Sequence, residues 1–290
     1  MNFSTLWRDG IGFWRVWVLT LGKRHGLFDS LRRPAPNDAV RLWRDAAQAL
    51  GLITSRGATA PGVKALLLDH DHPDYLAGHL MYGAIRSLDY DAMADFFKTG
   101  RTLDHLSRPR RNEAVEEATH WDHVMFLRRL PADVRARLAA GCDVLELGCG
   151  TGRWITAMRR AFPRSWFHGV DPDADTGAEV GFAETAGTTA SADIVYLGEV
   201  LHLTDKPQTL ANCARVLRPG GFLLVVEGFM PERVSSKKWE AVLFAMQLDQ
   251  ALQGARFMKR SELDLPKEFG KPRFVTLGGC VALAVAKKGG

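Results

Sequence analysis

The feature that most constrains the fold is a short apolar strand that runs directly into a glycine-rich loop. Residues 144–147 form the strand, whose third residue is Glu146, and glycines follow at Gly148, Gly150 and Gly152. Glycines allow a tight turn and let the main chain approach a ligand without interference from Cβ atoms. A helix is predicted directly after the loop. The segment therefore predicts the first strand, loop and helix of an open α/β sheet with a ligand at its carboxyl edge.

Short apolar segments alternate with helical ones after residue 143, which is the pattern of a mostly parallel sheet. The last two apolar segments are joined by Gly278-Gly279, a two-residue connection typical of an antiparallel hairpin. We therefore predict an α/β, Rossmann-like domain whose parallel sheet ends in an antiparallel hairpin. The predicted strands are residues 143–147, 166–170, 193–197, 222–227, 273–277 and 280–286.

The first hundred residues are predicted to be helical, because large apolar side chains recur at helical spacing over residues 7–21. A second helix is predicted over residues 39–50, with Asn37 or Asp38 as its cap. Residues 52–60, which contain a glycine turn, look like the wing of a winged-helix unit.

A run of basic residues with a proline, at residues 108–112, interrupts the helical pattern. We place the domain boundary close to this run. The prediction is a helical, winged-helix-like domain at residues 1–105 and the α/β domain at residues 106–290.

A winged-helix-like unit raises the alternative of DNA binding. The net charge of +5 and the pI near 9.1 permit an anionic ligand, but the basic residues are spread along the chain. The would-be recognition helix carries apolar residues such as Leu42 and Trp43, with Arg41 and Arg44 as its only cations. A helix that reads bases needs polar side chains toward the groove. We therefore favour helix packing over nucleic-acid binding.

Several other classes of protein are disfavoured by local patterns. The apolar stretch 11–22 is interrupted by Arg15 and is too short to span a bilayer. The four cysteines follow no metal-binding or disulfide spacing. We expect a cytoplasmic protein with free thiols, no membrane segment and no metal among its ligands.

Motifs after residue 143 resemble those of a known enzyme class. The loop reads G-x-G-x-G rather than the G-x-G-x-x-G of dinucleotide-binding proteins, and Asp171 stands 19 positions after Gly152. The resemblance is to the successive motifs of class I S-adenosylmethionine-dependent methyltransferases, and it rests on residues 144–154, 168–171, 192–202 and 215–221.

The N-terminal domain, together with Leu201-His202 and residues 226–231, is similar to the small-molecule O-methyltransferase family of plants and bacterial natural-product pathways. The resemblance covers most of the chain and is strongest over residues 143–231. It implies an enzyme that transfers a methyl group from S-adenosylmethionine to a small molecule, most simply at a hydroxyl. It also implies a homodimer formed through the N-terminal domain.

The predicted cofactor contacts follow from these motifs. Glu146 can receive the ammonium of the methionyl part, and the Asp171 carboxylate can accept both ribose hydroxyls. Leu197 and Gly198 would contribute backbone contacts at the end of the next strand. The loop glycines complete the set: Gly148, Gly150 and Gly152.

The adenine end of the cofactor site departs from the family. Only 21 residues separate Asp171 from Asp193, where the family fits a helix, a strand and an adenine-contacting acid. We predict that the helix is largely lost and that residues 178–182 are a remnant strand. Glu184 or Thr185 would then stand near the adenine in a more open pocket.

His202 is the predicted general base. It follows the strand 193–197 at the carboxyl edge, and an unperturbed imidazole pKa of about 6.5 suits proton removal near neutral pH. The resemblance places the family's catalytic histidine here and matches Glu227 with the acidic residue that orients it. The chain departs from the family at Leu203-Thr204, where an Asp-Trp pair is common, and at residues 254–258, which lack the second acidic partner.

The acceptor is expected between the carboxyl edge and helices at 110–125 and 236–253. The predicted lining residues are His120, Trp121, His123, Phe244, Met246 and Gln247. For His120 and His123, an ordinary helix surface and a metal site remain as alternatives. Rival functions are methylation at nitrogen, carbon or sulfur, other chemistry on the same fold, and a cofactor-sensing DNA-binding regulator.

Overall fold

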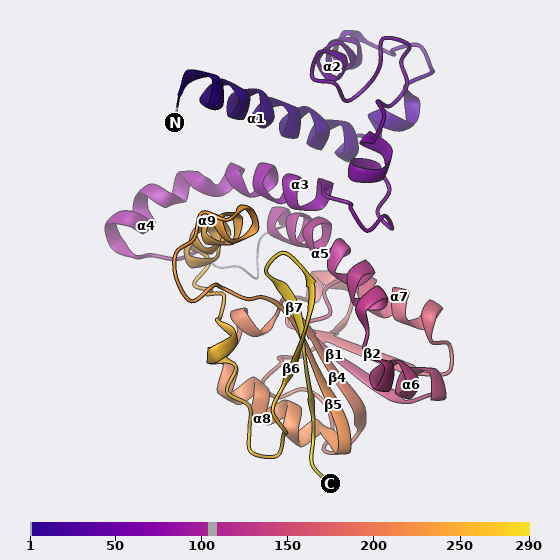
Figure 1. Ribbon diagram of the computed structural model, residues 1–290, viewed down its shortest axis with the longest axis vertical. Coiled ribbons are helices and arrows are strands. Elements are labelled where there is room, and N and C mark those ends of the chain that lie inside the picture. Colours follow the sequence, from indigo (N-terminus) through magenta and orange to yellow (C-terminus); the bar gives the residue numbers. More distant parts are fainter. Residues whose placement is uncertain (1, 104–108) are drawn as a thin grey trace. The chain divides into compact units, whose positions relative to one another are not determined.

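The computed structural model describes residues 2–103 and 109–290 (Figure 1). The chain divides into two compact units, residues 1–90 with 110–121, and residues 91–109 with 122–290. The helix α5 (Pro109–Arg129) contributes residues to both units. The boundary predicted between residues 105 and 106 lies outside the described residues.

The first unit is helical. Asn37 caps α2, as predicted, by accepting a hydrogen bond from the backbone of Val40. The predicted wing is a single antiparallel bridge between Ile53 and Thr59. The elements of this unit are α1 (Phe3–Arg24), η1 (Leu27–Ser30), α2 (Asp38–Ala49), η2 (Lys64–Leu68), α3 (Ala77–Arg86) and the start of η3 (Ser87–Ala92).

Helix α2 packs against α1 within this unit. The Trp43 side chain is buried, and its indole N–H donates to the carbonyl of Val18 at 2.9 Å. Ala47 on the same face is fully buried. The apolar face of α2 is therefore used for packing, as the sequence predicts. Since this face is buried, it cannot read the edges of DNA bases.

The second unit contains a seven-stranded sheet in the order β3-β2-β1-β4-β5-β7-β6. Strands β1 to β5 are parallel, and β7 runs antiparallel to both β5 and β6. The predicted sheet and its terminal hairpin are therefore confirmed. The strands are β1 (Asp143–Leu147), β2 (Trp166–Asp171), β3 (Glu179–Val180), β4 (Ala192–Gly198), β5 (Leu217–Gly228), β6 (Arg273–Gly278) and β7 (Val281–Lys287).

Helices cover the faces of this sheet, and Figure 1 shows α6 and α7 to one side of the strands and α8 to the other. Because both faces are covered, β4 is buried along nearly its whole length and reads as a continuous apolar run. The helices of the second unit are α4 (Met93–Thr99), the end of α5, α6 (Ala132–Ala140), α7 (Arg153–Ala161), α8 (Lys206–Val216) and α9 (Lys238–Leu252), with short turns η4 (Ala174–Thr176), η5 (Leu201–Leu203) and η6 (Arg260–Glu262).

The short connection between β2 and β4 holds a two-residue strand, β3, and no α-helix among its residues, all of which are described. The loop after β3 is fixed by polar side chains of α8. Asn212 Nδ2 donates to the carbonyls of Ala183 and Ala186, and Arg215 donates to those of residues 185–187. The remnant strand predicted at 178–182 is therefore confirmed as Glu179–Val180, and side-chain hydrogen bonds from α8 hold the loop that follows it.

Replacing Asn212 by alanine is expected to destabilise the second unit. Asn212 is 4% exposed, and the change would leave the carbonyl of Ala183 without its donor in a buried hydrogen bond, whereas that of Ala186 keeps Arg215. An unsatisfied buried polar group costs about 1–3 kcal/mol, so the free energy of unfolding in urea should fall by that order. Gln208→Ala, at an exposed position of the same helix, is the matched control. Equal unfolding midpoints for the two variants would contradict this account.

Candidate active site

The candidate site lies where the order of the parallel strands reverses, between β1 and β4. In open α/β sheets, ligands bind at the carboxyl ends of the strands at such a point. The loops after the two strands meet there, since a Cβ atom added to Gly148 would lie 2.5 Å from a methyl group of Val200. Residues of both loops therefore share one edge of the sheet.

The glycine loop is held by the strand next to β1. The N–H groups of Gly148 and Cys149 donate to the carbonyl of Val170 at 2.9 and 3.0 Å. All three glycines have positive φ, 75° at Gly148, 51° at Gly150 and 75° at Gly152, a region that disfavours other residues. A Cβ atom added at Gly150 or Gly152 would meet no atom within 4 Å. The backbone there faces open space that a ligand could fill.

Asp171 ends β2 with its carboxylate fixed beside this loop. One oxygen accepts from the backbone N–H of Gly150 at 2.8 Å, and the other accepts from that of Asp173 at 2.9 Å. A carboxylate oxygen has a further lone pair, so each can still accept a ligand hydroxyl. The predicted ribose contact is thus compatible with the hydrogen bonds that orient the side chain.

Glu146 is buried at the end of β1, 4% exposed, and its Oε2 lacks a hydrogen-bond partner among the described residues. Burial, followed by the charge of Asp171, raises its pKa well above the usual value. A buried carboxylate without a partner is costly, and a cationic ligand group would relieve that cost. The chemistry of this position therefore fits the ammonium of a methionyl group.

The other predicted backbone contacts, Leu197 and Gly198, end β4 at the same edge. The pairing of β4 with β1 stops at Tyr196, whereas its pairing with β5 continues to Gly198. The Leu197 side chain is fully buried, so only its backbone could meet a ligand. Gly198 admits no side chain, because an added Cβ would lie 2.5 Å from the Tyr196 hydroxyl.

His202 lies in the turn η5 directly after β4 and pairs with Glu227 near the end of β5. The imidazole Nδ1 is 2.8 Å from Glu227 Oε2, and the His202 backbone N–H donates to Oε1 at 3.3 Å. An ionised carboxylate only accepts hydrogen bonds, so the pair places the proton on Nδ1 and leaves the Nε2 lone pair free to accept one. The Phe257 ring packs 4.8 Å from the imidazole, within the segment 254–258 where the family has an acid.

Two acidic residues that the sequence prediction missed lie beside this pair. Glu199, the residue after β4, places Oε2 at 4.0 Å from His202 Nδ1. Asp122 on α5 is buried, and burial with the charge of Glu227 raises its pKa to about 8. Burial, then Glu227 and Asp122, raise the pKa of Glu199 well above its usual value. The sequence signal that could have predicted Glu199 as a site residue is its position three residues before His202, directly after a strand.

The predicted acceptor-lining residues of α5 fall in different units. His120 and Trp121 belong to the first unit, where the indole N–H of Trp121 donates to the carbonyl of Pro73 at 2.7 Å and the His120 ring lies 5.0 Å from that of His70. His123 belongs to the second unit and is half-buried. The described contacts of Trp121 and His120 are therefore structural ones inside the first unit.

The three predicted lining residues of α9 are all half-buried in the second unit. Gln247 uses its side-chain amide on the backbone, accepting from the N–H of Phe257 at 2.9 Å and donating to the carbonyl of Ala255 at 3.4 Å. It thereby fixes the segment that carries Phe257 against His202. Phe244 and Met246 make no polar contacts of this kind and stay predictions as lining residues.

No helix within the described ranges has the length and hydropathy that a membrane crossing requires.

Comparisons with known proteins agree with the sheet and its loops. A family model described as a methyltransferase domain matches residues 121–264. A probable S-adenosylmethionine-dependent methyltransferase of Mycolicibacterium smegmatis is 34% identical over an alignment of 135 residues, and the match covers 41% of this chain and 50% of that protein. The O-methyltransferase rstn1 of Aspergillus nomiae is 30% identical over an alignment of 170 residues, and the match covers 52% of this chain and 70% of that protein.

Among solved structures, human N-acetylserotonin methyltransferase in complex with SAM superimposes with a TM-score of 0.71 at 18% identity. The match covers 100% of this chain and 99% of the human one. At this identity the likeness concerns the fold alone. The chain spans only half of the length of the mycobacterial relative.

Proposed function

The chain belongs to the S-adenosylmethionine-dependent methyltransferase family, and from this premise we propose that it transfers a methyl group to a hydroxyl of a small molecule. The observation that carries the proposal is the pairing of two features at one sheet edge. One is the glycine loop that follows the buried Glu146, whose Oε2 has no hydrogen-bond partner among the described residues. The other is the buried pair of His202 and Glu227.

The cofactor would be held by the residues around the first loop. Glu146 would pair with the ammonium group, Asp171 with the ribose hydroxyls, and the backbone of the glycine loop with the chain between them. Bound S-adenosylmethionine would supply the methyl group as an electrophilic sulfonium. The names of the relatives support this choice of cofactor.

His202 would remove the proton of the acceptor hydroxyl. Glu227 holds the proton of the imidazole at Nδ1, which keeps the Nε2 lone pair available for the acceptor. Glu227 then stabilises the imidazolium that forms, because its carboxylate already accepts from Nδ1. His202 is thus the proposed catalytic residue and Glu227 a positioning residue.

The acceptor would be a phenol or a similar hydroxyl compound of natural-product biosynthesis, which is the substrate class of the family that the sequence resembles. His123, Phe244 and Met246 are the proposed lining residues, all from the second unit. The protein would act in the cytoplasm.

Calorimetric titration with S-adenosylmethionine and S-adenosylhomocysteine tests the cofactor part of the proposal. Saturable binding of both is expected. Incubation with methyl-labelled cofactor and a panel of phenols, anilines and thiols then tests the acceptor atom. Failure to bind either compound would refute the proposal, and labelling of amines or thiols alone would refute the hydroxyl assignment.

We also propose that the chain forms a homodimer through the first unit. Helix α1 exposes large apolar side chains, with Trp7 64%, Phe13 60% and Trp14 54% accessible. Exposed apolar surface of this kind marks an interface. The family resemblance supports a second copy of this chain as its occupant.

The double change Trp7→Lys and Trp14→Lys is expected to convert the dimer to a monomer, because buried lysines would replace the two indoles. Light scattering after gel filtration measures the mass. Leu42→Lys on α2, which also replaces an exposed apolar residue, is the control and should leave the dimer intact. A monomeric wild-type chain would refute the proposed dimer.

A further inference from the structure

The surroundings of His202 hold more acidic groups than a single histidine–carboxylate pair requires. Glu199, His202 and Glu227 each offer a ligand atom, and these atoms all lie within 4.8 Å of one another. Their side chains are 15%, 4% and 0% exposed. The group therefore combines one imidazole and two carboxylates in a nearly dry environment.

Asp122 adds an independent observation. It is 5% exposed, and its Oδ1 has no hydrogen-bond partner among the described residues. After burial, the charge of Glu227 raises the pKa of Asp122, and the charges of Glu227 and Asp122 raise the pKa of Glu199, as expected for carboxylates that lie near one another. A buried polar atom without a partner in a folded protein calls for an explanation, such as an ion.

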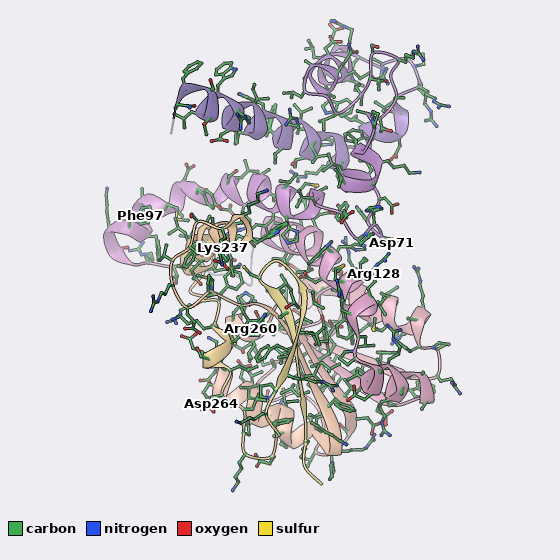
Figure 2. All side chains as sticks on the ribbon, viewed as in Figure 1. Asp71, Phe97, Arg128, Lys237, Arg260 and Asp264 are labelled. Carbon is green, nitrogen blue, oxygen red and sulfur yellow. The ribbon has the colours of Figure 1, made fainter. Side chains whose placement is uncertain are left out.

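These carboxylates have no cationic side chain paired with them among the described residues. Among the side chains of residues 2–103 and 112–290, no lysine or arginine forms an ion pair with Asp122, Glu199 or Glu227. Arg260 (Figure 2) packs its guanidinium over the rings of Phe229 and Phe274 instead, at 5.9 and 5.1 Å. Buried charges are normally paired or coordinate metals.

The backbone at Glu199 is strained. Its φ of 56° lies in the left-handed region, which is unfavourable for a residue with a side chain. The conformation is held by a hydrogen bond from its N–H to the carbonyl of Val226 at 2.8 Å. Strain of this kind collects at ligand sites, and here it accompanies a carboxylate kept beside His202 and Glu227.

We propose that Glu199, His202 through Nδ1, and Glu227 bind a divalent transition-metal cation such as Zn²⁺ or Mn²⁺. A mixed set of imidazole and carboxylates suits these ions better than Mg²⁺ or Ca²⁺, which prefer oxygen alone. With metal–ligand bonds of about 2.1 Å, the ligand atoms of a tetrahedral site lie about 3.4 Å apart. The distances from His202 Nδ1 to the carboxylates of Glu227 and Glu199, 2.8 and 4.0 Å, lie on either side of that value, so small movements of the side chains reach that geometry.

The consequence for catalysis rests on the proposed function. A metal on Nδ1 requires the imidazole proton to move to Nε2, and the ring stays neutral. With Nε2 protonated, His202 cannot accept the proton of an acceptor hydroxyl. The bound cation would therefore be a reversible inhibitor of methyl transfer.

Titration of the full chain with ZnCl₂ and, separately, MnCl₂ by calorimetry tests the site without cofactor or acceptor. One saturable site per chain is expected, and Glu199→Gln should weaken it by at least about tenfold. Glu179→Gln is the matched control, because Glu179 also pairs with a histidine, His168 at 2.9 Å, but on the surface. Absence of a saturable site, or equal weakening by both variants, would overturn the proposal.

Electron paramagnetic resonance of bound Mn²⁺ gives a second readout that does not depend on how a variant folds. Nitrogen coupling from one imidazole is expected in the wild-type chain, and its absence at saturation would also overturn the proposal. Because neither measurement uses methyl transfer, the two hypotheses can fail separately. A chain that binds Zn²⁺ but transfers no methyl group supports the metal site and refutes the proposed function.

Discussion

Replacing His202 by alanine is expected to lower kcat for methyl transfer to a hydroxyl by about 10²–10⁴-fold, the usual contribution of a positioned general base. Nε2 of the imidazole can accept the proton of the acceptor, because Nδ1 is already hydrogen-bonded to Glu227. Affinity for the cofactor should change little, since Glu146, Asp171 and the glycine loop do not contact His202 in the described hydrogen bonds. Initial rates at saturating cofactor measure the effect.

Two further variants separate the base from its surroundings. Glu227→Gln keeps the shape of the side chain but can donate as well as accept, so it no longer specifies the proton on Nδ1, and kcat should fall to a lesser degree than with His202→Ala. His168→Ala, at an exposed position of β2, controls for loss of an arbitrary histidine. A kcat for His202→Ala within twofold of the wild type would remove His202 as the base.

Most of the sheet could be predicted because a buried strand and a tight turn each leave a pattern within a few neighbouring residues. Strands such as β4 are covered on both faces, so they read as apolar runs whatever lies next to them. The glycine loop and Asp171 could be placed together because each stands at the carboxyl end of a parallel strand, and the Gly150 N–H indeed donates to Asp171. The cap at Asn37 is equally local.

The acidic surroundings of His202 could not be predicted in the same way. Glu199 comes close to His202 only because its backbone adopts a left-handed conformation held by β5. Asp122 stands between histidines on a helix whose charged composition resembles a solvated surface, yet it is buried. Gln247 was assigned to the acceptor, but the chain folds so that its amide binds the backbone at Phe257. The roles of Glu199 and Asp122 depend on residues of β5, which lie far from them in the sequence.

Replacing Glu146 by glutamine is expected to change cofactor affinity and stability in opposite directions. A hydrogen bond to a charged group contributes about 1.5–3 kcal/mol, so the Kd for S-adenosylmethionine should rise by about 10- to 100-fold. The cofactor-free chain should become more stable at neutral pH, because its Oε2 is buried without a partner and glutamine carries no charge there.

The pH dependence follows from the raised pKa of Glu146 in the folded chain. Between the usual carboxyl pKa of about 4.3 and the raised value, the folded chain binds more protons than the unfolded one, so stability falls as pH increases. Glu146→Gln lacks this term, and its stability gain over the wild type should therefore grow with pH across that window. Urea unfolding at several pH values, without cofactor, measures the gain. Glu179→Gln, at an exposed position, should show no such growth. A Glu146→Gln chain that binds the cofactor as tightly as the wild type, or that is less stable at neutral pH, would contradict the assignment of Glu146 as the ammonium site.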